Sequence, residues 1–124
     1  MATARRLLSL PALLIISTTA AAAQLDIDGI HGNETGCRVE AGGTYTSDDR
    51  FVLRADSYQA HESVCEFVEV LSSRSGAQVV KALCQGEGSY WLQSIIVSEA
   101  DPEGDSLLVF FDNGELWHEV RPCS

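Results

Sequence analysis

Residues 65–84 read CEFVEVLSSRSGAQVVKALC, and this stretch decides the fold because a cysteine stands at each end. Two runs rich in apolar and β-branched residues flank the turn-like segment Ser72–Gly76, which is the pattern of a β-hairpin. Pairing across the turn gives three opposed pairs: Leu71–Gln78, Phe67–Ala82 and Cys65–Cys84. Directly opposed residues in a non-hydrogen-bonded pair lie close enough for a disulfide. The stretch therefore predicts an antiparallel hairpin locked by a Cys65–Cys84 bridge.

The chain has four cysteines, and an even count in a short exported chain favours two disulfides. A zinc site usually needs closer spacing, such as Cys-x-x-Cys, and the sequence has no such pair. Four cysteines allow three connectivities. The hairpin register selects one of them, because it leaves Cys37 to pair with Cys123 and to join the two ends of the domain.

The remaining sequence alternates short strand-like runs with turn residues, which is typical of an all-β fold. Asn113-Gly114 is the strongest turn signal, because both residues accept positive φ in a tight hairpin. Its expected pairs are Phe111–Leu116, Val109–His118 and Leu107–Val120. The expected strands are Cys37–Ala41, Phe51–Ala55, Ser63–Leu71, Ala77–Gln85, Ser89–Ser98, Ser106–Asp112 and Glu115–Arg121. We predict a small antiparallel barrel or sandwich of about six to eight short strands with two disulfides.

One segment is ambiguous. Ser57–Leu71 has apolar residues at positions 64, 67, 68 and 71, and this spacing also fits a short helix. A strand that begins near Ser63 is favoured, because it agrees with the Cys65–Cys84 register.

The first 23 residues have the pattern of a secretory signal peptide. Arg5 and Arg6 precede an apolar run, and Ala21–Ala23 fits the Ala-x-Ala cleavage rule. The apolar run is too short to span a bilayer. We therefore expect a signal peptide over 1–23, a loose segment over 24–36 and one disulfide-stapled β domain over 37–124. The expected location is periplasmic or secreted, with no membrane association after cleavage.

The expected mature chain is strongly acidic. It keeps all 18 acidic residues and six of the eight basic residues, which gives a formal charge of −12. Such a charge disfavours nucleic acid and anionic membranes as partners and attracts a cationic protein. The alternative is that the charge serves solubility alone, and the oligomeric state stays open.

The sequence offers little to catalysis. His31, His61 and His118 are scattered, with the first two expected in loops and the third in a strand. His61-Glu62 begins like a helical zinc motif, but the second histidine is missing. We expect no catalytic residue, no metal site and no cofactor. The alternative function is a small periplasmic hydrolase or metal-binding protein that uses dispersed Asp, Glu and His residues.

Four large aromatic residues fall in neighbouring expected strands: Tyr90, Trp91, Phe110 and Trp117. Exposed on the barrel, they would form a protein-binding face beside the acidic residues. If both faces of the sheet are covered, they belong to the core instead.

Several short motifs resemble small exported bacterial proteins of uncharacterised function: Cys65-Glu66-Phe67, Cys84-Gln85-Gly86-Glu87-Gly88, Trp91 and Arg121-Pro122-Cys123. This resemblance implies a compact disulfide-bonded β domain.

The chain is also similar, more weakly, to periplasmic inhibitors of C-type lysozyme, which are small β-barrels with a Ser-Gly-x-x-Tyr loop and a later Trp-x-Lys-Gly segment. Ser75-Gly76-Ala77 matches the start of the first motif, with Val79 at the tyrosine position, and Trp91-Leu92 begins the second without its lysine. This similarity implies an exported, non-enzymatic binding or inhibitory module whose Ser75–Ala77 loop inserts into a cationic hydrolase such as lysozyme.

We predict that the exported protein begins at or near Gln24, because the Ala-x-Ala motif directly precedes this residue. Intact mass spectrometry of the exported protein measures this start. A soluble exported form that retains residues 1–23 would contradict the signal peptide.

Overall fold

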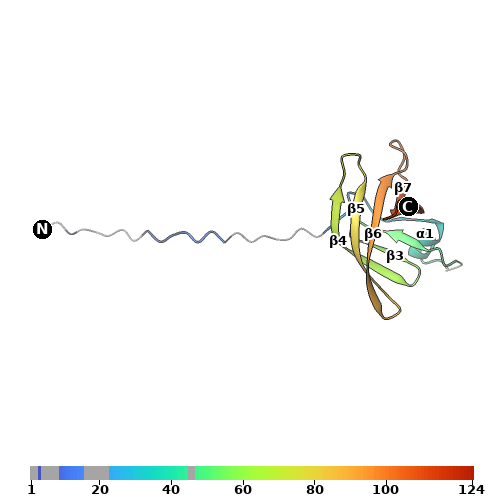
Figure 1. The fold of residues 1–124 in the computed structure, drawn as a ribbon, viewed down its shortest axis with the longest axis horizontal. Helices are drawn as coiled ribbons and strands as arrows, with labels where there is room; N and C mark the ends of the chain where they lie inside the picture. Colours follow the sequence, from blue (N-terminus) through green and yellow to red (C-terminus); the bar gives the residue numbers. More distant parts are fainter. Residues whose placement is uncertain (1–2, 4–8, 16–22, 45–46) are drawn as a thin grey trace.

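The computed structural model describes residues 3, 9–15, 23–44 and 47–124. The described residues form a closed barrel of eight antiparallel strands in sequence order, with one short helix (Figure 1). The elements are β1 (His31–Gly32), α1 (Glu34–Glu40), β2 (Phe51–Leu53), β3 (Ser57–Ala60), β4 (Ser63–Ser72), β5 (Gln78–Gly86), β6 (Ser89–Glu99), β7 (Leu107–Phe111) and β8 (Leu116–Pro122). The all-β prediction is confirmed, and the architecture is a barrel rather than a sandwich. Arg5, Arg6 and Ala21–Ala22 of the expected signal peptide lie outside the described residues.

The long strands β4, β5 and β6 lie side by side (Figure 1). Both predicted disulfides are confirmed, with Cα–Cα distances of 4.0 Å for Cys65–Cys84 and 5.1 Å for Cys37–Cys123. The predicted pairing of Phe67 with Ala82 is also confirmed. Near the turn the predicted register is wrong by one residue, and Leu71 pairs with Val79 instead of Gln78. A β-bulge between Phe67 and Glu69 accounts for the extra residue.

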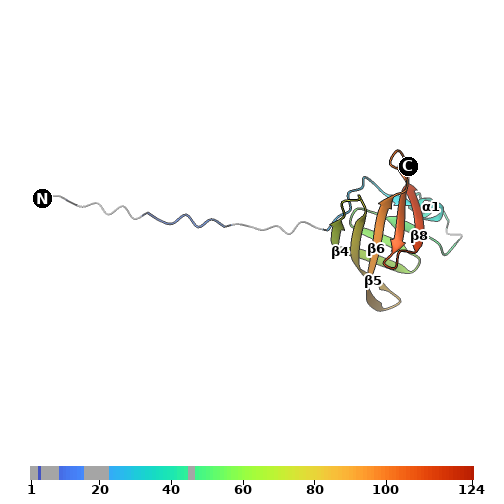
Figure 2. The same ribbon diagram turned by 45° about the horizontal axis from the view of Figure 1, so that its top comes forward.

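The expected strand Cys37–Ala41 is wrong, because most of this segment belongs to helix α1. Asn33 caps the helix, and its side-chain oxygen accepts hydrogen bonds from the Gly36 N–H at 2.8 Å and the Phe51 N–H at 3.0 Å. Gly36 allows α1 to approach β2 closely, since a Cβ atom there would lie 2.1 Å from the Phe51 carbonyl oxygen. The same cap therefore starts the helix and fixes it to the barrel. In both ribbon views α1 lies at the side of the barrel away from β4 (Figures 1 and 2).

The segment expected to be loose, 24–36, is instead bonded into the barrel. The Leu25 side chain is buried in the core, and its N–H donates to the Ala55 carbonyl at 2.7 Å. His31 and Gly32 form β1, which pairs with β2 on one side and with β8 on the other. His31 is therefore a buried strand residue and not a loop residue.

The helical alternative for Ser57–Leu71 is excluded, because this segment forms β3 and β4 with a turn at His61-Glu62. The Asn113-Gly114 hairpin between β7 and β8 is confirmed, as are its pairs Val109–His118 and Leu107–Val120. Leu116, however, pairs with Phe110 and not with Phe111, because the register shifts between Val109 and Phe110.

The barrel interior is filled by alternate residues of the strands. Its largest buried side chains include Tyr58, Phe51, Leu53, Ile95, Val80 and Val109. Because this core lies inside a closed barrel, the outward-facing residues of β4 to β6 do not contribute to it.

We predict that replacing both cysteines of a bridge with alanine lowers the free energy of unfolding by roughly 3 kcal/mol for Cys65–Cys84 and roughly 4.5 kcal/mol for Cys37–Cys123, because the second bridge closes a longer loop. The sequence separations are 19 and 86 residues. Urea denaturation of the two variants measures the order, and a larger loss for the Cys65–Cys84 pair would contradict it.

Candidate functional site

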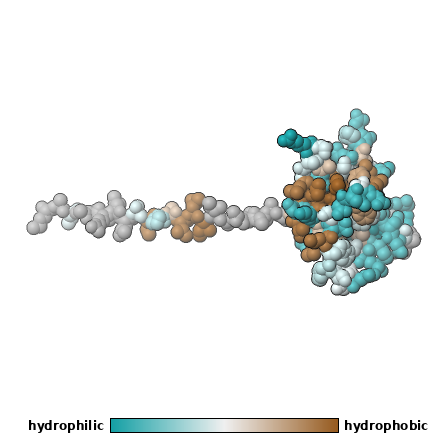
Figure 3. Space-filling view, viewed as in Figure 1, coloured by the Kyte–Doolittle hydropathy of each residue, from teal (hydrophilic) through white to brown (hydrophobic). Residues whose placement is uncertain are grey.

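The outer surface of β4, β5 and β6 carries exposed apolar side chains, and we call this surface the β4–β6 face. Its members are Val64, Val68 and Leu71 of β4, Val79 and Leu83 of β5, and Tyr90 and Leu92 of β6. Tyr90 and Leu92 are the most exposed, at 71% and 76% of their full surface. Figure 3 shows hydrophobic residues gathered on the side of the domain where Figure 1 places these strands.

Strand register brings these side chains together. Leu83 lies opposite Leu92 on β6, and Leu71 lies opposite Val79. Between these two apolar pairs, Lys81 forms an ion pair with Glu69 at 3.6 Å. The β4–β6 face thus carries two apolar groups with the Lys81–Glu69 ion pair between them, and the exposed Glu66 lies opposite Leu83 within it.

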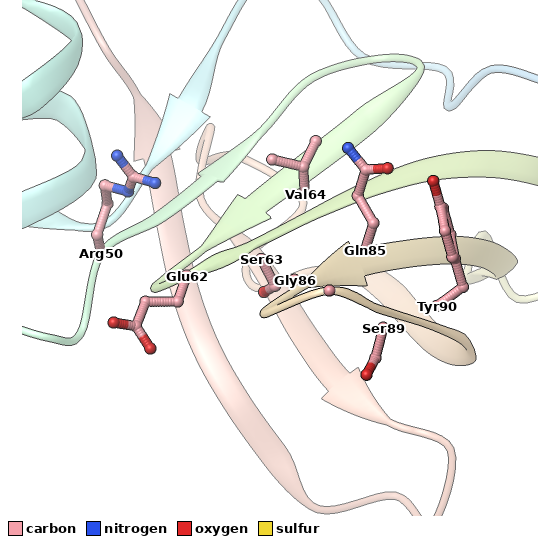
Figure 4. Close-up of a pocket in the computed structure, with 9 residues that line it drawn as sticks. Arg50, Glu62, Ser63, Val64, Gln85, Gly86, Ser89 and Tyr90 are labelled. Atoms are coloured by element: carbon pink, nitrogen blue, oxygen red, sulfur yellow. The ribbon is translucent and has the colours of Figure 1, made fainter.

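A groove continues from this face at the end of the strands where the β3–β4 and β5–β6 turns lie (Figure 4). A cavity of about 530 Å³ and a smaller one of about 160 Å³ share Val64, Gln85 and Tyr90 in their walls. Gly86, which lines the larger cavity, allows a close approach of two backbone segments, because a Cβ atom there would lie 2.3 Å from the Glu62 carbonyl oxygen. The β3–β4 and β5–β6 turns can therefore meet only around a glycine.

The four aromatic residues singled out from the sequence have different surroundings. Tyr90 is exposed at the groove, and Trp91 is partly exposed at 38%. Phe110 is half-buried. The Trp117 ring packs inside the barrel, with its centroid 4.6 Å from Phe111 and 4.9 Å from Phe51. The structure therefore assigns Trp117 to the core and leaves Tyr90 and Trp91 available at the surface.

The Ser75-Gly76-Ala77 loop lies in the β4–β5 turn, at the opposite end of the strands from Tyr90. Gln78 and Gln85, which pairs with Tyr90, are seven positions apart on β5. At about 3.3 Å per residue this is a distance of about 23 Å. The two predicted binding elements are therefore not brought together.

A second surface lies at the end of the barrel formed by the segment before β1 and the β6–β7 loop, and we call it the acidic cleft. This cavity of about 360 Å³ is lined by Asp26, Asp28, Glu99 and Asp105 together with His31, and by no Lys or Arg. A neighbouring cavity shares Asp26 and Glu99 and reaches Gly76. The Ser75–Ala77 loop therefore borders the acidic cleft and not the Tyr90 groove.

Burial lowers the pKa values of two histidines. His31 is buried, and desolvation outweighs the opposing effects of Asp105 and of the Gly29 backbone on its pKa. Desolvation likewise lowers the pKa of His118, against an opposing effect from Asp49, and the His118 ring stacks on Phe51 at 4.6 Å. Hydrogen bonds from Ser47 and Thr35 lower the pKa of the Asp49 carboxyl. Both imidazoles are therefore uncharged at neutral pH.

Sequence reasoning missed Val64, Leu83 and Leu92, because strand alternation alone does not say which face is covered. It also missed the acidic cleft. The sequence does contain a hint of the cleft, because acidic residues alternate with other residues at Asp26-Ile27-Asp28 and over Asp101–Asp105. Only the closure of the barrel by β1 brings these two segments together.

Comparison with protein families, with curated proteins and with solved structures gives no match for this chain. Among the described residues, no three His, Cys, Asp or Glu side chains are grouped so that they could hold a metal ion. Within the same part of the chain, the helical content includes nothing long and apolar enough to cross a membrane.

We predict that acidification destabilises the protein through His118. Because its pKa is below the ordinary value of 6.5 in the folded state, the unfolded chain takes up the proton first. The stabilisation is therefore present above that value and is lost as the pH falls towards the folded pKa.

Urea denaturation at about pH 7.5 and about pH 5 measures this loss. The His118→Gln variant, which lacks the titrating group, should lose less stability over the same range. An equal loss in the variant and in the native protein would show that His118 contributes nothing to it.

Proposed function

We propose that this protein is an exported, non-enzymatic binding module that docks a cationic protein, such as a C-type lysozyme, on its β4–β6 face. The observation that carries this proposal is the set of apolar side chains displayed on the outside of a barrel that is already closed and filled.

Large apolar side chains gathered on a small soluble domain mark an interaction surface. The core is complete without them, because the interior positions of the same strands are filled by Phe67, Val80 and Ile95. Leu92 and Tyr90 are more than two-thirds exposed, so folding gains little from their apolar character. A docked partner would remove this apolar surface from water.

The exposed carboxylates near the β4–β6 face indicate that the partner is positively charged. Glu62, Glu66, Glu69 and Glu87 are exposed on the face or at its border. Lys81 is a basic residue on the face, and its ammonium group is paired with Glu69, while Arg50 lines the groove that continues from the face. An apolar patch bordered by carboxylates complements an apolar patch bordered by Lys and Arg.

The two disulfides support a compartment outside the reducing cytoplasm, because such bridges persist in oxidising environments. An oxidising compartment is also where secreted lysozymes and other cationic hydrolases are met. The Ser75–Ala77 loop stays a predicted insertion element, and its position beside the acidic cleft would suit a basic target.

The proposal is tested by binding kinetics with a C-type lysozyme over salt concentrations from about 0.02 M to about 0.5 M. We predict that association slows as salt screens the acidic surface. Tyr90→Ala and Leu92→Ala should each weaken binding about tenfold, corresponding to roughly 1.4 kcal/mol, mainly through faster dissociation.

Leu116→Ala is the matched control, because Leu116 is a similarly exposed leucine, at 54%, that lies on β8 outside the face. It should bind like the native protein. Equal weakening by Leu116→Ala and Leu92→Ala, or an association rate that does not respond to salt, would contradict docking on the β4–β6 face.

A further inference from the structure

We propose that the acidic cleft at the loop end of the barrel is a binding site for a guanidinium group, the side chain of an arginine presented by a partner. This site lies at the far end of the strands from Tyr90 and uses none of the residues of the β4–β6 face. It can therefore exist whether or not that face docks a protein.

Four carboxylates from three separate segments line the cleft. Asp26 and Asp28 come from the segment before β1, Glu99 from the end of β6, and Asp105 from the β6–β7 loop. None of the four takes part in an ion pair within the described part of the chain. The cleft thus concentrates negative charge that the protein itself leaves uncompensated.

A buried polar group independently points to a ligand. His31 lines the same cleft, is 6% exposed, and its ring nitrogen Nδ1 is buried without a hydrogen-bond partner. The Gly29 backbone is near enough to favour a proton on the ring, yet no atom completes a hydrogen bond to Nδ1. A buried polar atom of this kind is costly unless a partner satisfies it.

The state of His31 suits a cation. Burial lowers its pKa, so the ring is uncharged at neutral pH and does not repel a positive ligand. A neutral imidazole also keeps one nitrogen as a hydrogen-bond acceptor. The cleft therefore offers carboxylate acceptors beside an uncharged ring, and it suits a ligand that brings hydrogen-bond donors.

The spread of the acceptors selects the kind of cation. A metal ion needs ligands that converge on one point, and the described residues contain no such group of three. A guanidinium instead offers five N–H donors in a planar fork, and it can bridge carboxylates on different walls. A cavity of about 360 Å³ is large enough to admit the end of an arginine side chain.

The N-terminal wall of the cleft is held in place by bonds to the barrel. The Leu25 N–H donates to Ala55, and the Asp26 N–H donates to the Gln78 side chain at 3.2 Å. The backbone of this wall is thus in place before a ligand arrives, which reduces the entropy lost on binding.

The test is an NMR titration of the exported, oxidised protein with N-acetyl-arginine methylamide, with the citrulline derivative as the neutral isostere. The arginine derivative should shift the His31 ring resonances and the amides of residues 26–31 and 104–107 in a saturable way. The citrulline derivative should shift neither. The lysine derivative should bind more weakly than the arginine derivative, because its ammonium group cannot bridge the walls.

Asp105→Asn and Glu99→Gln should each weaken binding about three- to fivefold, as expected for a partly exposed ion pair. Asp112→Asn is the matched control, because it removes the same charge from an exposed turn at the other end of the barrel. Equal weakening by Asp105→Asn and Asp112→Asn would show only a general effect of net charge. That result, or the absence of saturable shifts at His31, would overturn the proposal.

Discussion

The whole structure depends on the closure of the barrel by β1, a strand of only two residues. His31 and Gly32 pair with β2 and with β8, and the Cys123 N–H donates to Ile30 at 2.8 Å beside this junction. Without this junction, β2 and β8 would be open sheet edges that invite pairing with other chains. The Cys37–Cys123 bridge fixes the same place covalently, so a few residues determine whether a barrel exists.

Closure also determines which surfaces are available for binding. Once the interior is sealed, the outer positions of β4 to β6 are left without neighbours, and their apolar character has no role in the core. The acidic cleft depends on the same closure, because His31 belongs to β1 and Asp26 and Asp28 lie in the segment that leads into it. The two proposed sites are thus consequences of one topological event.

Local sequence patterns predicted what is local. The β4–β5 hairpin with its Cys65–Cys84 bridge and the Asn113-Gly114 turn were predictable, because pairing across a short turn follows from alternation and spacing. The Cys37–Cys123 bridge then followed by elimination. Bulges at Val68 and near Trp117 shifted two registers, since an extra residue leaves no simple sequence signal. β1, β3 and α1 were not predicted. A two-residue strand such as β1 has no periodicity, and only its long-range partners define it. The exposure of Tyr90 and the burial of Trp117 were likewise undecidable before the sheet was known to be closed.

The proposed docking surface is the outer face of β4, β5 and β6. Methyl NMR of the disulfide-bonded protein, with and without a C-type lysozyme, reports directly on this surface. We expect the methyl resonances of Val64, Leu83 and Leu92 to shift or broaden, while those of the core residues Val80 and Val109 do not move. Perturbation confined to another surface, or no perturbation at saturating lysozyme, would contradict it.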